Sequence, residues 1–133
     1  MNNVEQIIHD VIQAAFEVHR ILGPGLLESV YEEALCKELE IRNIGFERQK
    51  GIIVDYKGFE IKGQRVDLLV NRCLVVEIKA TKEIEEVFIA QVLTYLKILD
   101  LNLGLILNFN KALLKEGIKR VILTTNKNTK KKT

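Results

Sequence analysis

The sequence predicts a single α/β domain in which helices flank a small mixed β-sheet. The chain has 133 residues, the usual size of one domain with one hydrophobic core. Hydrophobic residues make up 47% of it and charged residues 29%, a balance typical of soluble globular proteins. The spacing of apolar residues changes from helical to short runs rich in branched side chains, so both helices and strands are expected.

Apolar residues at helical spacing predict three helices. The first covers residues 4–22 and ends before Gly-Pro-Gly at 23–25, because glycine frees the backbone and proline cannot continue a helix. The second follows at about 27–42 and the third at about 84–99, each with apolar side chains on one face.

Five short runs of branched residues predict the strands of the sheet. Three of them follow the second helix and two follow the third, and glycine or asparagine separates the first three. The predicted strands cover residues 52–56, 64–70, 73–80, about 103–109 and about 119–124. The predicted order of elements is therefore ααβββαββ.

The formal net charge of +2 conceals an asymmetry between the body and the C-terminus. The last seven residues hold four lysines and no acid, so the body has 16 basic and 18 acidic residues. We predict one domain over residues 1–126 and a flexible basic tail at 127–133. Any contact with nucleic acid is expected to depend on a local groove, with the tail either assisting or serving only as a solubilising end.

No apolar run approaches the ~18 residues that span a bilayer, and the N-terminus lacks the basic and apolar blocks of a signal peptide. Cys36 and Cys73 are isolated thiols without metal-ligand spacing, as in a reduced cytoplasmic protein. We therefore expect a cytoplasmic protein without membrane contact.

Charged residues interrupt two of the predicted apolar strands. Because side chains alternate along a strand, Glu77 and Lys79 share one face of the run at 73–80. Asp67 interrupts the preceding strand, and burying an ionised carboxylate costs several kcal/mol unless it is paired or binds a metal. A single site that contains all three residues explains them better than two unrelated occurrences of buried charge. The alternative is an ion pair of Lys79 with Asp67 or Glu77 at a sheet edge.

Glu28 is a further candidate near the start of the second predicted helix. An acid there complements the helix dipole by about 0.3–1 kcal/mol, and Ser29 with Glu32 has the spacing of a capping box. If Glu28 joins the site instead, the site contains three carboxylates and one lysine. Their summed charge is −2, which one divalent cation neutralises. Oxygen ligands without His or Cys suit Mg²⁺ or Mn²⁺.

Gln91 and Tyr95 lie four residues apart on one face of the third predicted helix. Gln91 interrupts the apolar stripe of that helix, where a buried amide needs partners. It is either a satisfied polar group of the core or a residue that faces a substrate.

Asp67, followed by Glu77-Ile78-Lys79, resembles the D…(D/E)-x-K signature of the PD-(D/E)XK nuclease superfamily. The chain departs from the pattern at Val66, which stands where the superfamily name has proline. The resemblance implies a restriction-endonuclease-like core and Mg²⁺-dependent hydrolysis, with Mn²⁺ as a substitute.

Two flanking motifs extend the resemblance over roughly residues 4–124. The run GLLESVY at 25–31 is similar to the motif that names the GxxExxY group of this superfamily. Gln91-x-x-x-Tyr95 resembles the Q-x-x-x-Y motif of its RecB-like and lambda-exonuclease-like branches. By this resemblance Gln91 and Tyr95 would hold the phosphate backbone of the substrate or tie the helix to the site, and Tyr31 would contact the substrate, which we expect to be DNA.

The resemblance also implies roles for the charged residues. Asp67 and Glu77 would ligate the metal, the carbonyl of Ile78 would add an oxygen, and Glu28 would reach the ion directly or through a water. Lys79 would position the attacking water and help to deprotonate it.

Two other interpretations stay open at this point. One is a non-cleaving nucleic-acid-binding or accessory subunit that keeps the fold, and the other is an ordinary α/β domain with surface ion pairs. The intact set of Asp67, Glu77 and Lys79 favours the enzyme. So small a chain is expected to rely on self-association or a protein partner to complete a substrate groove.

Overall fold

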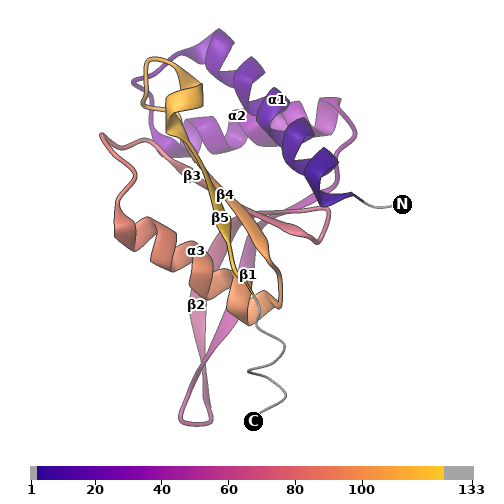
Figure 1. Cartoon of the computed structure of the whole chain (residues 1–133), viewed down its shortest axis with the longest axis vertical. Coiled ribbons are helices and arrows are strands. Elements are labelled where there is room, and N and C mark those ends of the chain that lie inside the picture. The colour runs from indigo at the N-terminus through magenta and orange to yellow at the C-terminus, as the bar shows by residue number, and fades with distance from the viewer. Residues whose placement is uncertain (1–2, 125–133) are drawn as a thin grey trace.

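The computed structural model describes residues 3–124, and the predicted basic tail at 127–133 lies outside them. The elements follow one another in the predicted order, with one short 3-10 helix added before the last strand (Figure 1). They are α1 (Val4–Leu22), α2 (Glu28–Ile41), β1 (Phe46–Tyr56), β2 (Phe59–Val70), β3 (Leu74–Lys79), α3 (Glu86–Leu99), β4 (Leu103–Asn108), η1 (Leu114–Gly117) and β5 (Ile118–Ile122).

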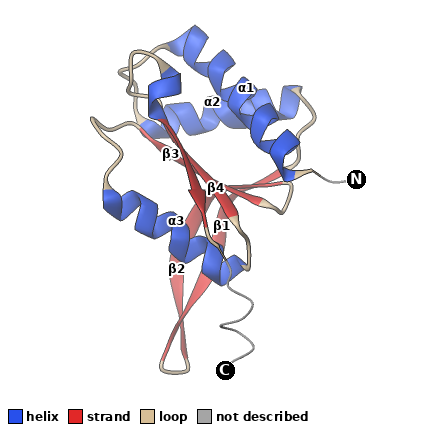
Figure 2. Ribbon diagram, viewed as in Figure 1, coloured by secondary structure: helices blue, strands red, loops and turns tan. Residues whose placement is uncertain are grey.

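The five strands form one mixed sheet in the order β1-β2-β3-β4-β5. The β3–β4 pair is parallel and is connected through α3, whereas the other three pairs are antiparallel. Helices α1 and α2 pack on one face of the sheet and α3 packs on the other (Figure 2). The predicted fold class, a small mixed sheet flanked by helices, is confirmed.

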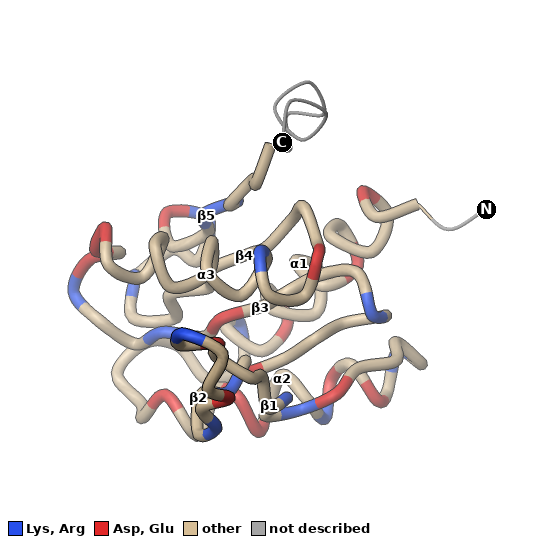
Figure 3. Tube along the Cα trace, turned by 90° about the horizontal axis from the view of Figure 1, so that it is seen from below, with Lys and Arg blue, Asp and Glu red and all other residues tan. Residues whose placement is uncertain are grey.

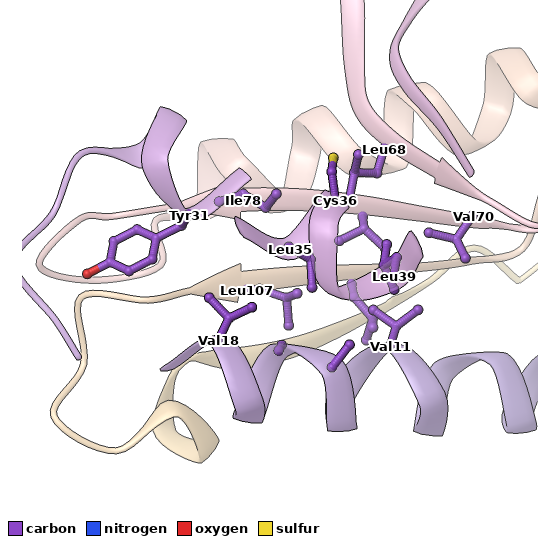
Figure 4. Close-up of a cluster of buried hydrophobic side chains, with 14 of the residues drawn as sticks. Val11, Val18, Tyr31, Leu35, Cys36, Leu39, Leu68, Val70, Ile78 and Leu107 are labelled. Carbon is purple, nitrogen blue, oxygen red and sulfur yellow. The ribbon is translucent and has the colours of Figure 1, made fainter. Parts of the chain in front are cut away.

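The larger core lies between the sheet and the pair α1–α2 (Figure 4). Val76 and Ile78 of β3 point into it and are fully buried, as the alternation along that strand predicts. Val11 of α1 and Leu35 of α2 meet them there. Full burial of such a side chain contributes about 1.5–3 kcal/mol relative to exposure, so this core fixes α2 over the strand that carries Glu77.

A second core lies under α3 and determines how closely that helix approaches the sheet. Val75 of β3 and Val92 of α3 are both fully buried in it. Gly104 of β4 has no side chain at the point of contact, and an added Cβ would lie 2.6 Å from Val92 Cγ1. The absent side chain lets α3 lie close to the sheet at β4, on the face from which Glu77 and Lys79 of β3 project.

The first two strands are longer than predicted. β1 begins at Phe46, and β2 begins at Phe59 immediately after the turn formed by Lys57 and Gly58. Both turn residues have positive φ values, 52° and 87°, as the tight turns that match the twist of a hairpin require. The hairpin therefore projects well beyond α3 (Figure 1). No helix among residues 3–124 is long and apolar enough to cross a membrane.

Candidate active site

Two carboxylates meet where β2 and β3 stop pairing. The ladder between these strands runs from Val70–Leu74 to Leu68–Val76 and then ends. Beyond it, Asp67 Oδ2 accepts a hydrogen bond of 2.9 Å from the Ile78 amide, and the Asp67 amide donates one of 3.2 Å to Glu77 Oε1. The two carboxylates thus replace the missing ladder bonds, which is why both can sit inside otherwise apolar strands.

Glu77 is buried, with 3% of its surface exposed. Burial raises the pKa of its carboxyl to about 9, and repulsion from the nearby Asp67 adds to the shift. A cation placed between the two groups would relieve that repulsion and favour the ionised form of Glu77.

Lys79 projects from β3 toward α3, on the same side as Glu77. Its Nζ donates a hydrogen bond of 3.4 Å to Gln91 Oε1 and lies 4.4 Å from the centroid of the Phe88 ring. Within residues 3–124 it makes no salt bridge, so the alternative in which Lys79 pairs with Asp67 or Glu77 at a sheet edge is not realised. Its amine is held by neutral groups of α3 beside the carboxylates.

Glu28 reaches the same end of β3 from the opposite face of the sheet. Its carboxylate accepts a hydrogen bond from the backbone of Ala80, the residue that follows β3. The residue as a whole is exposed, but partial burial of its carboxyl raises the pKa, with Lys79 lowering it and Asp67 raising it further. The capping box is absent, because the N-cap residue of α2 is Leu27, which makes no side-chain cap hydrogen bond.

The described part of the chain, residues 3–124, contains no three His, Cys, Asp or Glu side chains close enough together to hold a metal as they are placed. Asp67 and Glu77 each use an oxygen to accept a backbone N–H, and Glu28 stays bound to Ala80. The donors are all oxygen and their charge suits a divalent cation, so the set fits Mg²⁺ or Mn²⁺ in its chemistry. Binding an ion by all three would require their side chains to turn.

Gln91 and Tyr95 belong to one hydrogen-bonded chain that ends at Lys79. The Tyr95 hydroxyl accepts from Gln64 Nε2 at 2.6 Å and from Gln91 Nε2 at 2.8 Å, while the carbonyl of Gln91 accepts from Lys79. Tyr95 is buried, with 1% of its surface exposed. Gln91 is thus a satisfied amide, and the contacts it makes hold the lysine.

Tyr31 is not brought to this site. Its ring is fully buried and stacks on Phe109, with 4.7 Å between the ring centroids. Its hydroxyl donates to the Gly23 carbonyl at 2.5 Å and accepts from the Leu26 amide at 3.1 Å, so it holds the loop between α1 and α2. This placement gives Tyr31 a structural position instead of the substrate contact expected from its motif.

Gln49 and Glu32 join the site without having been predicted. Gln49 Nε2 donates to both oxygens of Glu32, at 3.0 and 2.9 Å, and to Asp67 Oδ1 at 3.3 Å. Glu32 is 7% exposed and also accepts from Arg48 at 2.7 Å. Gln49 therefore ties Asp67 to α2. For Glu32 the only signal in the sequence is the capping-box spacing, which points to a different role. For Gln49 there is no signal, because it stands among polar residues of an edge strand.

The backbone at Gln49 has φ of 53°, a left-handed conformation that costs a non-glycine residue roughly 1–2 kcal/mol. We expect Gln49→Ala and Gln49→Gly both to weaken binding of Mn²⁺ by about 10- to 100-fold, as loss of a group that orients a ligand does. The glycine variant should be the more stable of the two by about 1 kcal/mol, because glycine adopts positive φ without strain. Calorimetric titration with Mn²⁺ and thermal unfolding of both variants measure these effects.

Equal stability of Gln49→Ala and Gln49→Gly would show that the backbone at position 49 is not strained. Unchanged Mn²⁺ affinity in both would show that Gln49 does not orient Asp67.

Along residues 3–124, basic and acidic residues are mixed rather than gathered by sign. Figure 3 shows basic and acidic residues interspersed along the helices and strands. The candidate site therefore differs from its surroundings by burial and hydrogen bonding, and a large basic face does not mark it.

Comparison with known proteins agrees with this geometry. Residues 5–121 match the family model described as the PD-(D/E)XK nuclease superfamily, a span that includes every candidate residue. No curated protein and no solved structure shows significant similarity to the chain.

Proposed function

Since the chain belongs to the PD-(D/E)XK nuclease superfamily, we propose that it is a metal-dependent nuclease that hydrolyses phosphodiester bonds of DNA. One observation carries the proposal. Where β2 and β3 part, a buried Glu77 lies hydrogen-bonded to the Asp67 backbone, with Lys79 two residues further along the same strand face. A buried carboxyl group whose pKa is raised to about 9, beside a second carboxylate and a lysine, is typical of functional sites.

In this proposal Asp67, Glu77 and the carbonyl oxygen of Ile78 hold a Mg²⁺ or Mn²⁺ ion. Glu28 lies at the end of the same strand and contributes through a water. When bound, such an ion lowers the pKa of water and stabilises charge on the phosphate. The buried position of Glu77 makes that electrostatic effect stronger than it would be in open solvent.

The amine of Lys79 orients the attacking water and takes part in its proton transfer. Gln91 and the Phe88 ring fix the position of that amine, at 3.4 Å and 4.4 Å respectively. Tyr95 and Gln64 in turn fix the amide of Gln91. The Q-x-x-x-Y pair thus acts on the lysine, while DNA contacts other parts of the surface.

Within the superfamily we assign the chain to the GxxExxY group. Tyr31 of that motif shapes the loop before α2, since its hydroxyl bonds to the backbone of Gly23 and Leu26, and Gly25 lies in that loop with φ of 103°. Glu28, between them, is the residue directed to the end of β3. We further propose that a second copy or a partner protein completes the substrate groove.

Incubation of the purified protein with single- and double-stranded DNA and RNA tests the proposal. We expect cleavage of DNA in Mg²⁺ or Mn²⁺ and none in EDTA. Cleavage that persists in EDTA would contradict metal dependence. Binding without cleavage in either metal would favour the non-cleaving accessory subunit.

Replacing Gln91 by leucine tests the role of that amide. The lysine loses the acceptor that holds it, so we expect cleavage to slow by about tenfold, equivalent to about 1.4 kcal/mol from a hydrogen bond to a charged group. Affinity for DNA in Ca²⁺ should stay within about twofold of the wild type. Single-turnover rates and binding isotherms measure the two quantities.

The same substitution at Gln13, an exposed residue of α1, serves as the matched control. A loss of affinity in Gln91→Leu with an unchanged cleavage rate would place Gln91 in contact with DNA instead.

A further inference from the structure

An open pocket of about 530 Å³ lies between α3 and the β1–β2 hairpin. Lys79 and Gln91 line it, so the pocket begins at the candidate catalytic lysine. Its apolar walls come from Val54 of the hairpin and from Val87 and Phe88 of α3. The mechanism proposed above leaves this space unused.

The walls of the pocket match the chemistry of a nucleobase. Val87 is 63% exposed, and Phe88 and Val54 are only half-buried. A base has apolar faces and a polar edge, and Gln64 lines the same pocket with its amide group. The volume of the pocket also falls within the range of about 300–1,000 Å³ that is typical of small-molecule sites.

A strip of exposed apolar side chains continues from the pocket along the hairpin. Ile61 lies directly opposite Val54, and Tyr56 lies two residues further along β1, opposite Phe59, so these four share one face. Ile61, Tyr56 and Phe59 are 49%, 58% and 71% exposed. Figure 1 shows that this part of the hairpin extends beyond α3, where no other described element covers it.

Basic side chains accompany the strip. Lys57 Nζ lies 5.6 Å from the centroid of the Tyr56 ring, and Lys62 follows Ile61 in sequence. Aromatic platforms beside basic groups are how proteins bind single-stranded nucleic acid, because bases stack on the rings while the cations meet the phosphates. The body of the chain is slightly acidic, so such stacking has to supply affinity that bulk charge does not.

We propose that the pocket takes one unpaired base next to the scissile phosphate and that the hairpin strip binds the adjoining unpaired nucleotides. The inference rests on the proposed nuclease function and names its substrate class: single-stranded nucleic acid, or the unpaired end of a duplex. Bases inside a duplex hide their faces in the stack, and unstacking one costs a few kcal/mol.

Fluorescence anisotropy in Ca²⁺ tests the inference by binding alone. The probes are a labelled 12-nucleotide single strand, its blunt duplex, and the same single strand with one abasic position moved along its length. We expect the single strand to bind at least tenfold more tightly than the duplex, and one abasic position to weaken it by about tenfold or more.

Tyr56→Ser combined with Phe59→Ser should weaken binding of the single strand by at least tenfold, and Val87→Ser should remove most of the effect of the abasic position. All three residues are exposed, so the variants should melt as the wild type does. The matched control combines Ile41→Ser with Leu113→Ser, which are 72% and 54% exposed and lie on other elements. That control should keep wild-type affinity.

Equal affinity for single strand and duplex, or no binding of any probe, overturns the inference. Wild-type affinity for the single strand in the Tyr56→Ser, Phe59→Ser variant also overturns it. The inference fails as well if sedimentation shows that the wild type is a dimer and this variant a monomer, because the strip would then be a contact between copies. Cleavage is measured separately: binding as expected without cleavage refutes the nuclease function alone, and cleavage of duplex without preference refutes the substrate class alone.

Discussion

Lys79→Met is expected to abolish cleavage of DNA while leaving the fold and DNA binding intact. Methionine keeps much of the aliphatic stem but removes the amine, which lies over the Phe88 ring and in the proposed mechanism handles the proton of the attacking water. Positioned proton-transfer groups contribute about 10²- to 10⁴-fold in rate, so single-turnover cleavage in Mg²⁺ should fall by at least 100-fold. Affinity for DNA in Ca²⁺ should change by less than about threefold.

Lys82→Met is the matched control, because Lys82 is exposed and lies only three residues further along the chain. It should cleave at the wild-type rate. If Lys79→Met still cleaves at more than about a tenth of the wild-type rate, Lys79 is not the catalytic lysine. If it loses DNA binding as well, the residue holds the phosphate backbone instead.

Glu77→Gln should stabilise the metal-free protein, and the gain should grow with pH. The folded-state pKa of Glu77 is about 9, well above the ordinary value of 4.5, so between these values the folded chain holds a proton that the unfolded chain has lost. Its contribution to stability is therefore complete below about pH 4.5 and is lost as the pH rises toward 9. The slope approaches about 1.4 kcal/mol per pH unit for one proton. Glutamine does not titrate, so thermal unfolding in EDTA from pH 5 to 9 isolates this effect.

The same pair of proteins should respond oppositely to metal. Mg²⁺ bound only to the folded state raises its stability by about 2.7 kcal/mol at a hundredfold excess over Kd. The wild type should gain this stability, whereas Glu77→Gln should gain little. The gain of the wild type should increase as the pH rises, because the proton on Glu77 that competes with the metal is lost. Identical melting curves of the wild type in EDTA and Mg²⁺ would refute the metal site, and a variant that tracks the wild type at every pH would refute the raised pKa.

The parts of the fold that depend on local chain chemistry could be predicted from the sequence. The apolar stripe and the Gly-Pro-Gly at 23–25 predict α1 at its observed bounds, Val4–Leu22. The faces of β3 follow from alternation alone, which placed Glu77 and Lys79 together opposite the α1–α2 core. The sequence predicts β1 six residues too short, because the first part of the strand is polar and an edge strand does not need apolar side chains on both faces.

The parts of the site that depend on long-range packing could not be predicted. Gln49 meets Asp67 and Glu32 from a left-handed backbone conformation, and nothing in its polar neighbours signals that conformation. Tyr31 shares a motif with Glu28, yet the helix turns its ring into the core. The orientations of Gln49 and Tyr31 are set by elements distant in sequence. Asp67, Glu77 and Lys79, in contrast, lie on two strands that are adjacent in sequence, so their spacing could be recognised there.

Anomalous scattering from Mn²⁺ in crystals of the protein tests most directly whether these residues form a metal-dependent site. We expect one strong peak in contact with the carboxylates of Asp67 and Glu77 and the carbonyl oxygen of Ile78, near Glu28, and no peak there in Glu77→Gln. A wild-type crystal grown in millimolar Mn²⁺ with no peak between Asp67 and Glu77, or a peak that persists in Glu77→Gln, would contradict the proposed site.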